Sequence, residues 1–383
     1  MNKKIILAYS GDLDSTLCIP WLKENRDFDV ITVCVDVGQS ADFKAIQKRA
    51  IAAGACAFHL VDAKKEYVEN FIWPVLKAGA IYENKYHLGT AAAGALIAKI
   101  LVEYARKEKA ETIAHGASQE GNYQKRFAVS INSLAPDIEL VAPWLVWKIK
   151  SREEGIRYLA RRKLPVPVTK KNSYSKNENI WHISTKGLEL EDTNAEPIYK
   201  KILSITVMPE KAPNKPVYIE IDFENGIPVA LNGKKTEAIA LITALNKIGG
   251  SNGIGISDLT ENRINDKKVR SIYEAPGAAI LYYAHEKLEH LCLDRQTYSF
   301  KQILALRTAA LIYGGSWYSA LREALSAFTD STQKNITGKV KLKLYKGAIT
   351  AAGVASDNSL LKAEEKMAAS KAKKSAKPAK KKK

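Results

Sequence analysis

A glycine-containing turn near the start of the chain has the residue types that bind phosphate. A strand-like run ends in Ala8, Tyr9 and Ser10, and the turn that follows, 11–16, leads into a helix-like run. Backbone amides at the N-terminus of a helix carry partial positive charge and attract anions. Ser, Gly and Asp are also the residues of an ordinary turn and helix cap, so the turn alone fits a structural role equally well.

The runs around this turn predict a parallel sheet covered by helices. Strand-like and helix-like runs alternate over the first 115 residues: strands at 3–9, 30–37, 56–61 and 112–115, and helices at 15–24, 41–53, 64–77 and 90–107. This alternation is typical of βαβ units, and ligands of open parallel sheets bind in loops at the carboxyl ends of strands. Two ligand loops are therefore expected, 10–16 and 115–126.

A change of pattern marks a second domain. After the proline-rich segment 164–168, strand-like runs are joined by tight-turn signals such as Asn225-Gly226. The expected elements are strands at 217–223 and 227–231, helices at 237–247, 278–291 and 300–327, and a closing strand at 339–345. We therefore expect an α/β domain at 1–168, an α+β domain at 169–361 and a tail at 362–383.

Much of the positive charge lies in that tail. The formal net charge is +18, and ten lysines against two glutamates give residues 362–383 +8 of it. A Lys-Ala-Ser-Pro composition has little to bury, so the tail is expected to be disordered. Without aromatic residues or a reading motif it predicts weak, nonspecific contact with nucleic acid, and no specific recognition.

Cysteine and histidine spacing argues against a metal centre. The four cysteines are far apart, none is in a C-x-x-C pair, and the six histidines are scattered. We expect reduced thiols in a cytoplasmic protein, and no metal bound by protein groups alone. The apolar run at the start of the sequence is too short for the hydrophobic region of a signal peptide. No run approaches the roughly 18 apolar residues of a membrane span.

The phosphate turn belongs to a longer series of motifs. Residues 8–16 read AYSGDLDST and resemble A-Y-S-G-G-L-D-T-S, the opening loop of the argininosuccinate synthase family. Further matches follow in the family's order: PWLKE at 20–24, DVGQ at 36–39, KYHLGT at 85–90, AHG at 114–116, WHIS at 181–184, ENR at 261–263, IYE at 272–274 and LDR at 293–295. They cover nearly the whole folded body, and chance or a shared fold alone would not reproduce them.

The resemblance implies a fold and a reaction. The first domain would be an ATP-pyrophosphatase domain of the adenine nucleotide alpha hydrolase type, and the second a synthetase and multimerisation domain in a homotetramer or dimer. In this family, citrulline attacks the α-phosphorus of ATP and pyrophosphate leaves; aspartate then displaces AMP, which gives argininosuccinate for arginine biosynthesis. Mg²⁺ would arrive with the nucleotide. Positioning and electrostatics carry such chemistry, so no catalytic nucleophile is expected.

Site residues are carried over position by position. By resemblance, ATP would contact residues of the first turn, the end of the second strand and the 115–122 loop: Ala8, Tyr9, Ser10, Gly11, Asp12, Leu13, Asp14, Ser15, Thr16, Val35, His115 and Gly116. Citrulline would contact Tyr86, Asn122, Arg126, Ser175, Ser184, Glu261 and Tyr273. Aspartate would contact Thr90, Ser118 and again Asn122.

Several positions depart from the family pattern at the ligand loops. Asp12 replaces the second glycine of the phosphate turn, where a carboxylate about 4 Å from a phosphate charge would cost roughly 4 kcal/mol at an effective dielectric of about 20. The other departures are Ala91 and Gly94 for a serine and an arginine, Glu120 for a lysine, Tyr123 for an aspartate and Lys186 for a glutamate.

These departures keep a second hypothesis open. An altered member of the family would act as a binding or assembly protein, with little or no ligase activity. A third hypothesis, a pyrophosphatase that modifies tRNA, would use the basic tail. The chain lacks the paired reactive cysteines of relatives that transfer sulfur, which argues against this third reading.

Overall fold

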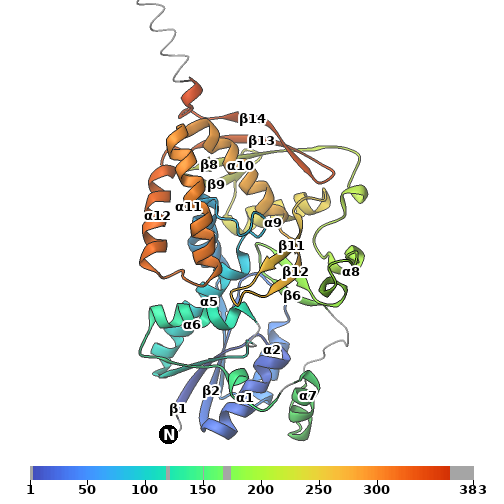
Figure 1. Cartoon of the computed structure of the whole chain (residues 1–383), viewed down its shortest axis with the longest axis vertical. Helices are drawn as coiled ribbons and strands as arrows, with labels where there is room; N and C mark the ends of the chain where they lie inside the picture. The colour runs from blue at the N-terminus through green and yellow to red at the C-terminus, as the bar shows by residue number, and fades with distance from the viewer. Residues whose placement is uncertain (1–2, 118–120, 150, 167–173, 363–383) are drawn as a thin grey trace, which may run out of the picture.

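The computed structural model describes residues 3–117, 121–149, 151–166 and 174–362. The expectations for Ser118, for the junction at 168/169 and for nearly all of the lysine tail fall outside these residues. Figure 1 shows the parallel sheet with its helices at one end of the molecule and the second domain at the other.

The first domain is built on a five-stranded parallel sheet, of which the alternating runs predict four strands and not the fifth. Its strands are β1 (Lys3–Ala8), β2 (Phe28–Asp36), β3 (Ala57–Asp62), β4 (Thr112–His115) and β5 (Glu139–Val141). They lie in the order β3-β2-β1-β4-β5, so the order reverses between β1 and β4. The loops that leave these two neighbouring strands therefore begin side by side, at the place where open α/β sheets bind ligands.

Helices cover both faces of this sheet. They are α1 (Leu13–Arg26), α2 (Phe43–Ala52), α3 (Lys64–Glu66), the π-helical turn η1 (Tyr67–Ile72), α4 (Trp73–Ala78), α5 (Gly89–Glu108), α6 (Asn122–Leu134) and α7 (Arg152–Arg161), with the 3-10 turn η2 at Pro143–Leu145. Ile5 and Leu7 pack with α1 and α7, whereas Ile6 packs with α5. This burial on both faces explains why β1 is a continuous apolar run.

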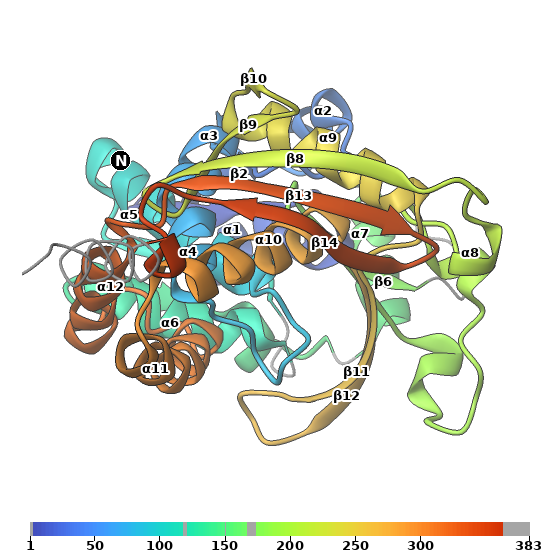
Figure 2. The ribbon, with the colours of Figure 1, turned by 90° about the horizontal axis from the view of Figure 1, so that it is seen from above.

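The second domain contains two antiparallel sheets. One has the order β10-β9-β8-β13-β14 and the other β11-β12-β7-β6. The strands are β6 (Ser175–Glu178), β7 (Ile183–Lys186), β8 (Val217–Glu224), β9 (Ile227–Leu231), β10 (Lys234–Lys235), β11 (Ile256–Asn262), β12 (Lys268–Glu274), β13 (Gly338–Tyr345) and β14 (Ala348–Ala355). Seen from above, β8, β13 and β14 run side by side across α10 (Pro276–Cys292) (Figure 2).

The remaining helices connect these sheets. They are α8 (Tyr199–Ile202), α9 (Ala238–Ser251), α11 (Arg295–Tyr313) and α12 (Ala320–Gln333), with 3-10 turns η3 (Leu188–Glu191) and η4 (Pro209–Lys211). Apolar residues of β8 and β13 pack with α9 and α10 in the same core cluster as α5, so the core is continuous from one domain to the other.

Two predictions for this domain were wrong. The expected helix 300–327 is two helices, because Gly315 adopts a left-handed φ of 88° and ends the run. A Cβ at Gly315 would lie 2.8 Å from Arg126 Cα, so this turn packs directly on α6. The strand at 339–345 does not close the fold either, since β14 pairs with it through a hairpin.

The contact between the two ligand loops can be tested at Gly116. A Cβ there would lie 2.7 Å from Ser15 N, so an alanine would force the backbones of both loops apart. We expect Gly116→Ala to lower the free energy of unfolding by about 1–3 kcal/mol in urea denaturation. Gly353→Ala is the control, because its Cβ would meet no atom closer than 3.9 Å. An equal effect of the two substitutions would contradict the contact.

Candidate nucleotide and amino-acid site

The phosphate turn lies between β1 and α1. Gly11 has a φ of 78°, which lets the chain reverse directly after the strand. Asp12 is the N-cap of α1: its carboxylate oxygen Oδ1 accepts a hydrogen bond from the Ser15 amide at 2.8 Å and from the Ser15 hydroxyl at 2.6 Å. Arg49 donates to the Gly11 carbonyl oxygen from the neighbouring α2.

The capping role changes the significance of Asp12. The sequence suggests a carboxylate that repels phosphate, whereas in the fold this carboxylate is turned to its own helix and uses one amide. The amides of Leu13 and Asp14, at the start of the same helix, are not used by any hydrogen bond among the described residues. Two backbone donors therefore remain at the helix N-terminus, where an anion is favoured.

Side chains beneath the turn hold its shape. The Tyr9 hydroxyl lies 3.2 Å from Thr16 Oγ1, and the Ser10 and Ser15 hydroxyls are 3.1 Å apart. Burial raises the pKa of Tyr9 to about 12, so it stays a neutral phenol. With the hydrogen bonds of Ser15 and Thr16 to Asp12, these contacts join five of the predicted residues of the first loop in one hydrogen-bonded unit.

The second loop leaves β4 next to the first. His115 is buried, its Nδ1 accepts a hydrogen bond from the Ala117 amide, and burial lowers its pKa to about 4, so the ring is neutral at pH 7. Gly116 packs against Ser15, as described above. Val35, also on the list, is buried near the end of β2, where its carbonyl oxygen accepts from Gln39.

A cavity between the two domains gathers most of the predicted amino-acid ligands. Seven of them line it, from α5, α6, β7, β11, β12 and the segment before α5: Tyr86, Thr90, Asn122, Arg126, Ser184, Glu261 and Tyr273. Ser175 does not line it. It is exposed at the start of β6, opposite Lys186, which places it on the strand beside the cavity.

Glu261 is the centre of the polar network in this cavity. It is buried, and its Oε1 and Oε2 accept hydrogen bonds from the hydroxyls of Tyr273 at 2.7 Å and Tyr313 at 2.9 Å. Burial, and next the charge of Glu261, raises the pKa of both phenols well above their usual range. They therefore remain donors, and the carboxylate stays fixed.

Tyr313, which the sequence did not indicate, connects this network to the first domain. Its hydroxyl accepts from Asn122 Nδ2 at 2.9 Å, and its carbonyl oxygen accepts from Arg126 Nε at 2.8 Å. The Arg126 guanidinium also lies 4.7 Å from the centre of the Tyr313 ring. No motif marks Tyr313, because it is the last residue of a helix and reads as an ordinary core aromatic.

Buried rings support the opposite wall. Tyr86 stacks on Tyr273, with ring centres 4.9 Å apart, and its hydroxyl accepts from the Ala91 amide. The Thr90 hydroxyl pairs with His182 Nε2 at 2.9 Å, and burial lowers the pKa of His182 to about 3. The Thr90 hydroxyl is therefore positioned by a neutral histidine.

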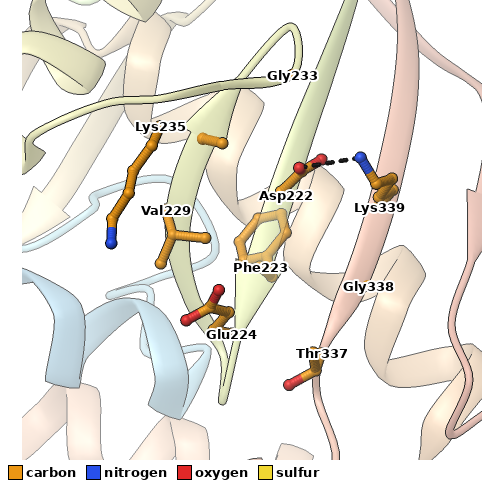
Figure 3. Close-up of a pocket in the computed structure, with 10 residues that line it drawn as sticks. Asp222, Phe223, Glu224, Val229, Gly233, Lys235, Thr337, Gly338 and Lys339 are labelled. Carbon is orange, nitrogen blue, oxygen red and sulfur yellow. Dashed lines mark hydrogen bonds and ion pairs between the residues drawn. The ribbon is translucent and has the colours of Figure 1, made fainter.

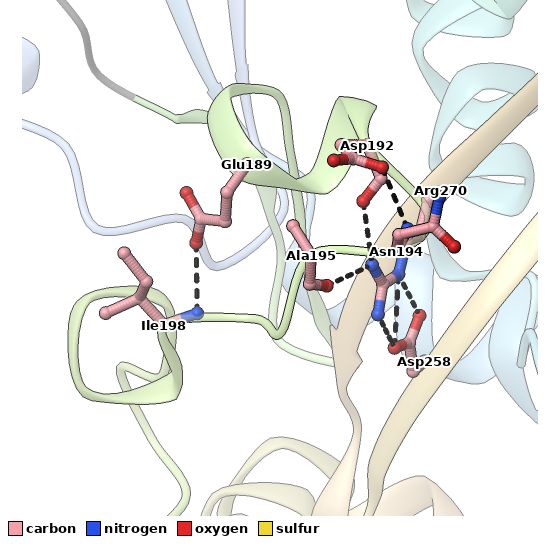
Figure 4. A network of polar contacts seen from close by, with 7 residues as sticks. All are labelled: Glu189, Asp192, Asn194, Ala195, Ile198, Asp258 and Arg270. Carbon is pink, nitrogen blue, oxygen red and sulfur yellow. Dashed lines mark hydrogen bonds and ion pairs between the residues drawn. The ribbon is translucent and has the colours of Figure 1, made fainter.

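An arginine network fixes the hairpin that carries Glu261 and Tyr273. Figure 4 shows the Arg270 guanidinium between the Asp258 carboxylate and the carbonyl oxygens of Asp192 and Ala195. Arg270 lies on β12 and Asp258 on β11, so this network joins the two strands to the 192–195 loop. The two strands that carry Glu261 and Tyr273 are thus fixed by contacts with the 192–195 loop.

A separate hollow lies between β8, β9 and β13. It contains none of the predicted site residues, and its polar groups include an ion pair at 3.1 Å between Asp222 and Lys339 (Figure 3). The described residues form no cluster of three or more metal-ligating side chains. Among them, no helix is long and apolar enough to span a membrane.

The fold is that of a parallel α/β domain, a class that often binds nucleotides, and the second domain completes a cavity that seven of the predicted amino-acid ligands line. Residues 4–165 match the family model described as the arginosuccinate synthase N-terminal HUP domain, and residues 174–381 match the model of the C-terminal domain. The chain belongs to the argininosuccinate synthase family. The predicted α/β fold and the stated resemblance are thereby confirmed.

Curated relatives agree over most of their length. Argininosuccinate synthase of Acetivibrio thermocellus is 53% identical over 363 residues, which is 95% of this chain and 90% of the relative. Those of Carboxydothermus hydrogenoformans and Desulforamulus reducens are 52% and 53% identical over 94% and 93% of this chain, and over 90% and 89% of their own lengths.

The partly buried Asp14 gives the phosphate turn a pH dependence. Burial, and next the charge of Asp12, raises the pKa of Asp14 to about 7. Between pH about 4 and 7 the native state therefore binds this proton more tightly than the unfolded chain, and stability falls as the pH rises through that window. We expect Asp14→Asn to stabilise the protein by about 2 kcal/mol at pH 8, and by less at pH 5.

Melting curves of the two proteins at both pH values check this expectation. Asp357→Asn, a change at a fully exposed aspartate, is the control and should have little effect at either pH. A difference between Asp14→Asn and the parent that is the same at pH 5 and pH 8 would contradict the account.

Proposed function

We propose that this chain joins citrulline and aspartate to form argininosuccinate, with ATP cleaved to AMP and pyrophosphate. The observation that carries the proposal is the convergence of seven predicted ligand residues on one cavity from both domains. The loop that contacts the phosphate turn at Gly116 leads to Asn122, which lines that cavity. Membership of the family supplies the reaction.

The reaction needs alignment and charge rather than a protein nucleophile. In the first step, the ureido oxygen of citrulline forms a bond to the α-phosphorus, and the bond to pyrophosphate breaks. In the second, the neutral amine of aspartate bonds to the activated ureido carbon, and AMP leaves with the oxygen. We assign the amides of Leu13 and Asp14 to the phosphates, where preorganised donors stabilise the leaving group.

The amino-acid contacts follow from the cavity. Arg126 has its Nε fixed by Tyr313, which leaves its terminal nitrogens for a substrate carboxylate. Glu261, held by two tyrosines, is suited to an ammonium group. We assign citrulline to Tyr86, Asn122, Arg126, Ser184, Glu261 and Tyr273, with Ser175 beside them, and aspartate to Thr90, Asn122 and Ser118.

Mg²⁺ fits the site as a companion of the phosphates. The described residues offer no complete metal cage, but the carboxyl group of Asp14 lies in the first turn of α1, next to the phosphate turn. Burial, and next the charge of Asp12, raises the pKa of Asp14 although Arg152 opposes the shift, so a further cation at the turn would stabilise its carboxylate. Mg²⁺ would supply that charge and neutralise the polyphosphate.

Release of AMP tests the proposal directly. Pure protein with ATP, Mg²⁺, citrulline and aspartate is expected to release AMP and pyrophosphate in equal amounts, and to require both amino acids for argininosuccinate. Omitting each amino acid in turn provides the control. No AMP at millimolar substrate concentrations would reject the proposal and favour a binding or assembly role.

The effect of Asp12 on ATP binding follows from its capping bonds. Asp12→Gly removes the charge and frees the Ser15 amide, so we expect the Kd for ATP to fall at least tenfold in calorimetry. Asp12→Asn keeps a capping side chain without the charge, and should fall between Asp12→Gly and the parent. Weaker ATP binding by both variants would show that the carboxylate assists the nucleotide.

We also propose that the chain forms a homo-oligomer, a dimer or tetramer, through α11. Phe300, Ile303 and Leu306 follow one another at helical spacing on this helix and are 52%, 62% and 61% exposed. Three neighbouring large apolar side chains in water favour a protein partner, and most soluble oligomers form from copies of the same chain.

The location we propose is the cytoplasm. Free cysteines and the proposed use of ATP support it.

Oligomer formation is tested by charge placed on that face. Ile303→Lys is expected to convert the oligomer into monomers in size-exclusion chromatography with light scattering, because a buried unpaired ammonium opposes association. Gln302→Lys adds the same charge at an exposed polar position of the same helix and should leave the mass unchanged. A parent protein that is monomeric would contradict the proposal.

A further inference from the structure

Two departures from the family pattern meet in space. Gly94 on α5 faces Tyr123 on α6, and a Cβ at Gly94 would lie 3.3 Å from Cε1 and 3.6 Å from Cδ1 of that tyrosine. The Tyr123 ring also packs on Phe127, with ring centres 5.4 Å apart. The ring therefore occupies the space that a larger side chain at position 94 would need, so the two substitutions depend on each other.

The seated ring is also a wall of the amino-acid cavity. Tyr123 lines this cavity together with Tyr86 and Arg126. Burial raises the pKa of Tyr123 above its usual value, and the nearest charge, Arg126, opposes that rise only in part. At neutral pH the residue presents an uncharged hydroxyl, where a carboxylate would hold an ammonium group.

The charges around Tyr123 favour carboxylates. Among the described residues that line the cavity, Arg126, Lys186 and Arg263 are basic, and Glu261 is the single acid. Both oxygens of Glu261 already accept tyrosine hydroxyls. Burial, and next the charge of Arg263, lowers the pKa of Lys186, while the charge of Glu261 opposes that shift. A second ammonium group brought by a ligand would meet repulsion from Arg126 and Lys186.

We propose that Tyr123, seated on Gly94, makes the cavity recognise its amine substrate through the two carboxylates and not through the ammonium group. The proposal rests on the proposed function, because it concerns the second amino acid of that reaction. A positive surrounding favours the neutral form of the substrate amine, which is the form that attacks the activated carbon. Tyr123 is thus a specificity-determining residue for a dicarboxylate amine.

A comparison of aspartate with succinate tests this directly. Succinate keeps both carboxylates and lacks the amine. We would titrate each into the full-length protein with citrulline and α,β-methylene-ATP present, so that no turnover occurs. The parent protein is expected to bind succinate as tightly as aspartate or more tightly, because the ammonium group makes no favourable contact. In Tyr123→Asp, aspartate is expected to bind at least tenfold more tightly than succinate.

Tyr123→Asn separates charge from shape. It removes the same ring as Tyr123→Asp without adding a charge, so it should keep the parent's ratio of the two affinities even if both ligands bind more weakly. Tyr123→Phe keeps the ring on Gly94 and should also keep that ratio. Should Tyr123→Asp fail to fold, the ratio in the parent still decides.

Three results would overturn the inference. They are a parent protein that prefers aspartate to succinate more than about threefold, a ratio unchanged in folded Tyr123→Asp, and a parent protein that binds neither dicarboxylate. The result of this titration can be distinguished from the result of the AMP assay. AMP release together with a strong preference for aspartate would support the proposed ligase activity and reject the role of Tyr123. Equal binding of aspartate and succinate without AMP release would support the role of Tyr123 and reject the ligase activity.

Discussion

The structure depends on the first turn of α1, where backbone amides must stay available at the point where β1 and β4 diverge. The first four backbone amides of a helix have no partner within the helix, and each of them can donate a hydrogen bond to a nearby acceptor. Here Asp12 takes the amide of Ser15, and Gly116 brings the second loop against the same residue. The amides of Leu13 and Asp14 are left as the anion site. The order of strands places that site at the edge of the sheet facing the second domain.

The amino-acid cavity depends on a second constraint, the fixed position of one buried carboxylate. Glu261 lies on a hairpin of the second domain, yet Tyr313 connects it through Asn122 and Arg126 to α6 of the first. The two domains therefore share one hydrogen-bonded network and one apolar core. Departures from the family pattern fit into this frame: Asp12 caps its own helix, and Tyr123 fills the space above Gly94. The altered loops are consistent with a working ligase of this family.

Much of the first domain could be predicted from sequence, because strands buried on both faces are continuous apolar runs and the phosphate turn is a local motif. The break after Tyr313 was missed although the Gly314-Gly315 pair is a turn signal, and the contact with Arg126 that this turn makes, some 190 positions away in the chain, cannot be read from sequence. Tyr313 and the pairing of Gly94 with Tyr123 were missed for the same reason: their roles come from tertiary contacts. Resemblance predicted seven amino-acid ligands that the fold brings to one cavity, and also Ser175, which lies on an edge strand beside it.

A structure of the protein with ATP and Mg²⁺ tests the central claim most directly. The account predicts phosphate oxygens within hydrogen-bonding distance of the amides of Leu13 and Asp14, with the Asp12 carboxylate still bound to Ser15 or displaced toward the metal. Nucleotide bound elsewhere, with those two amides in contact with water alone, would contradict it.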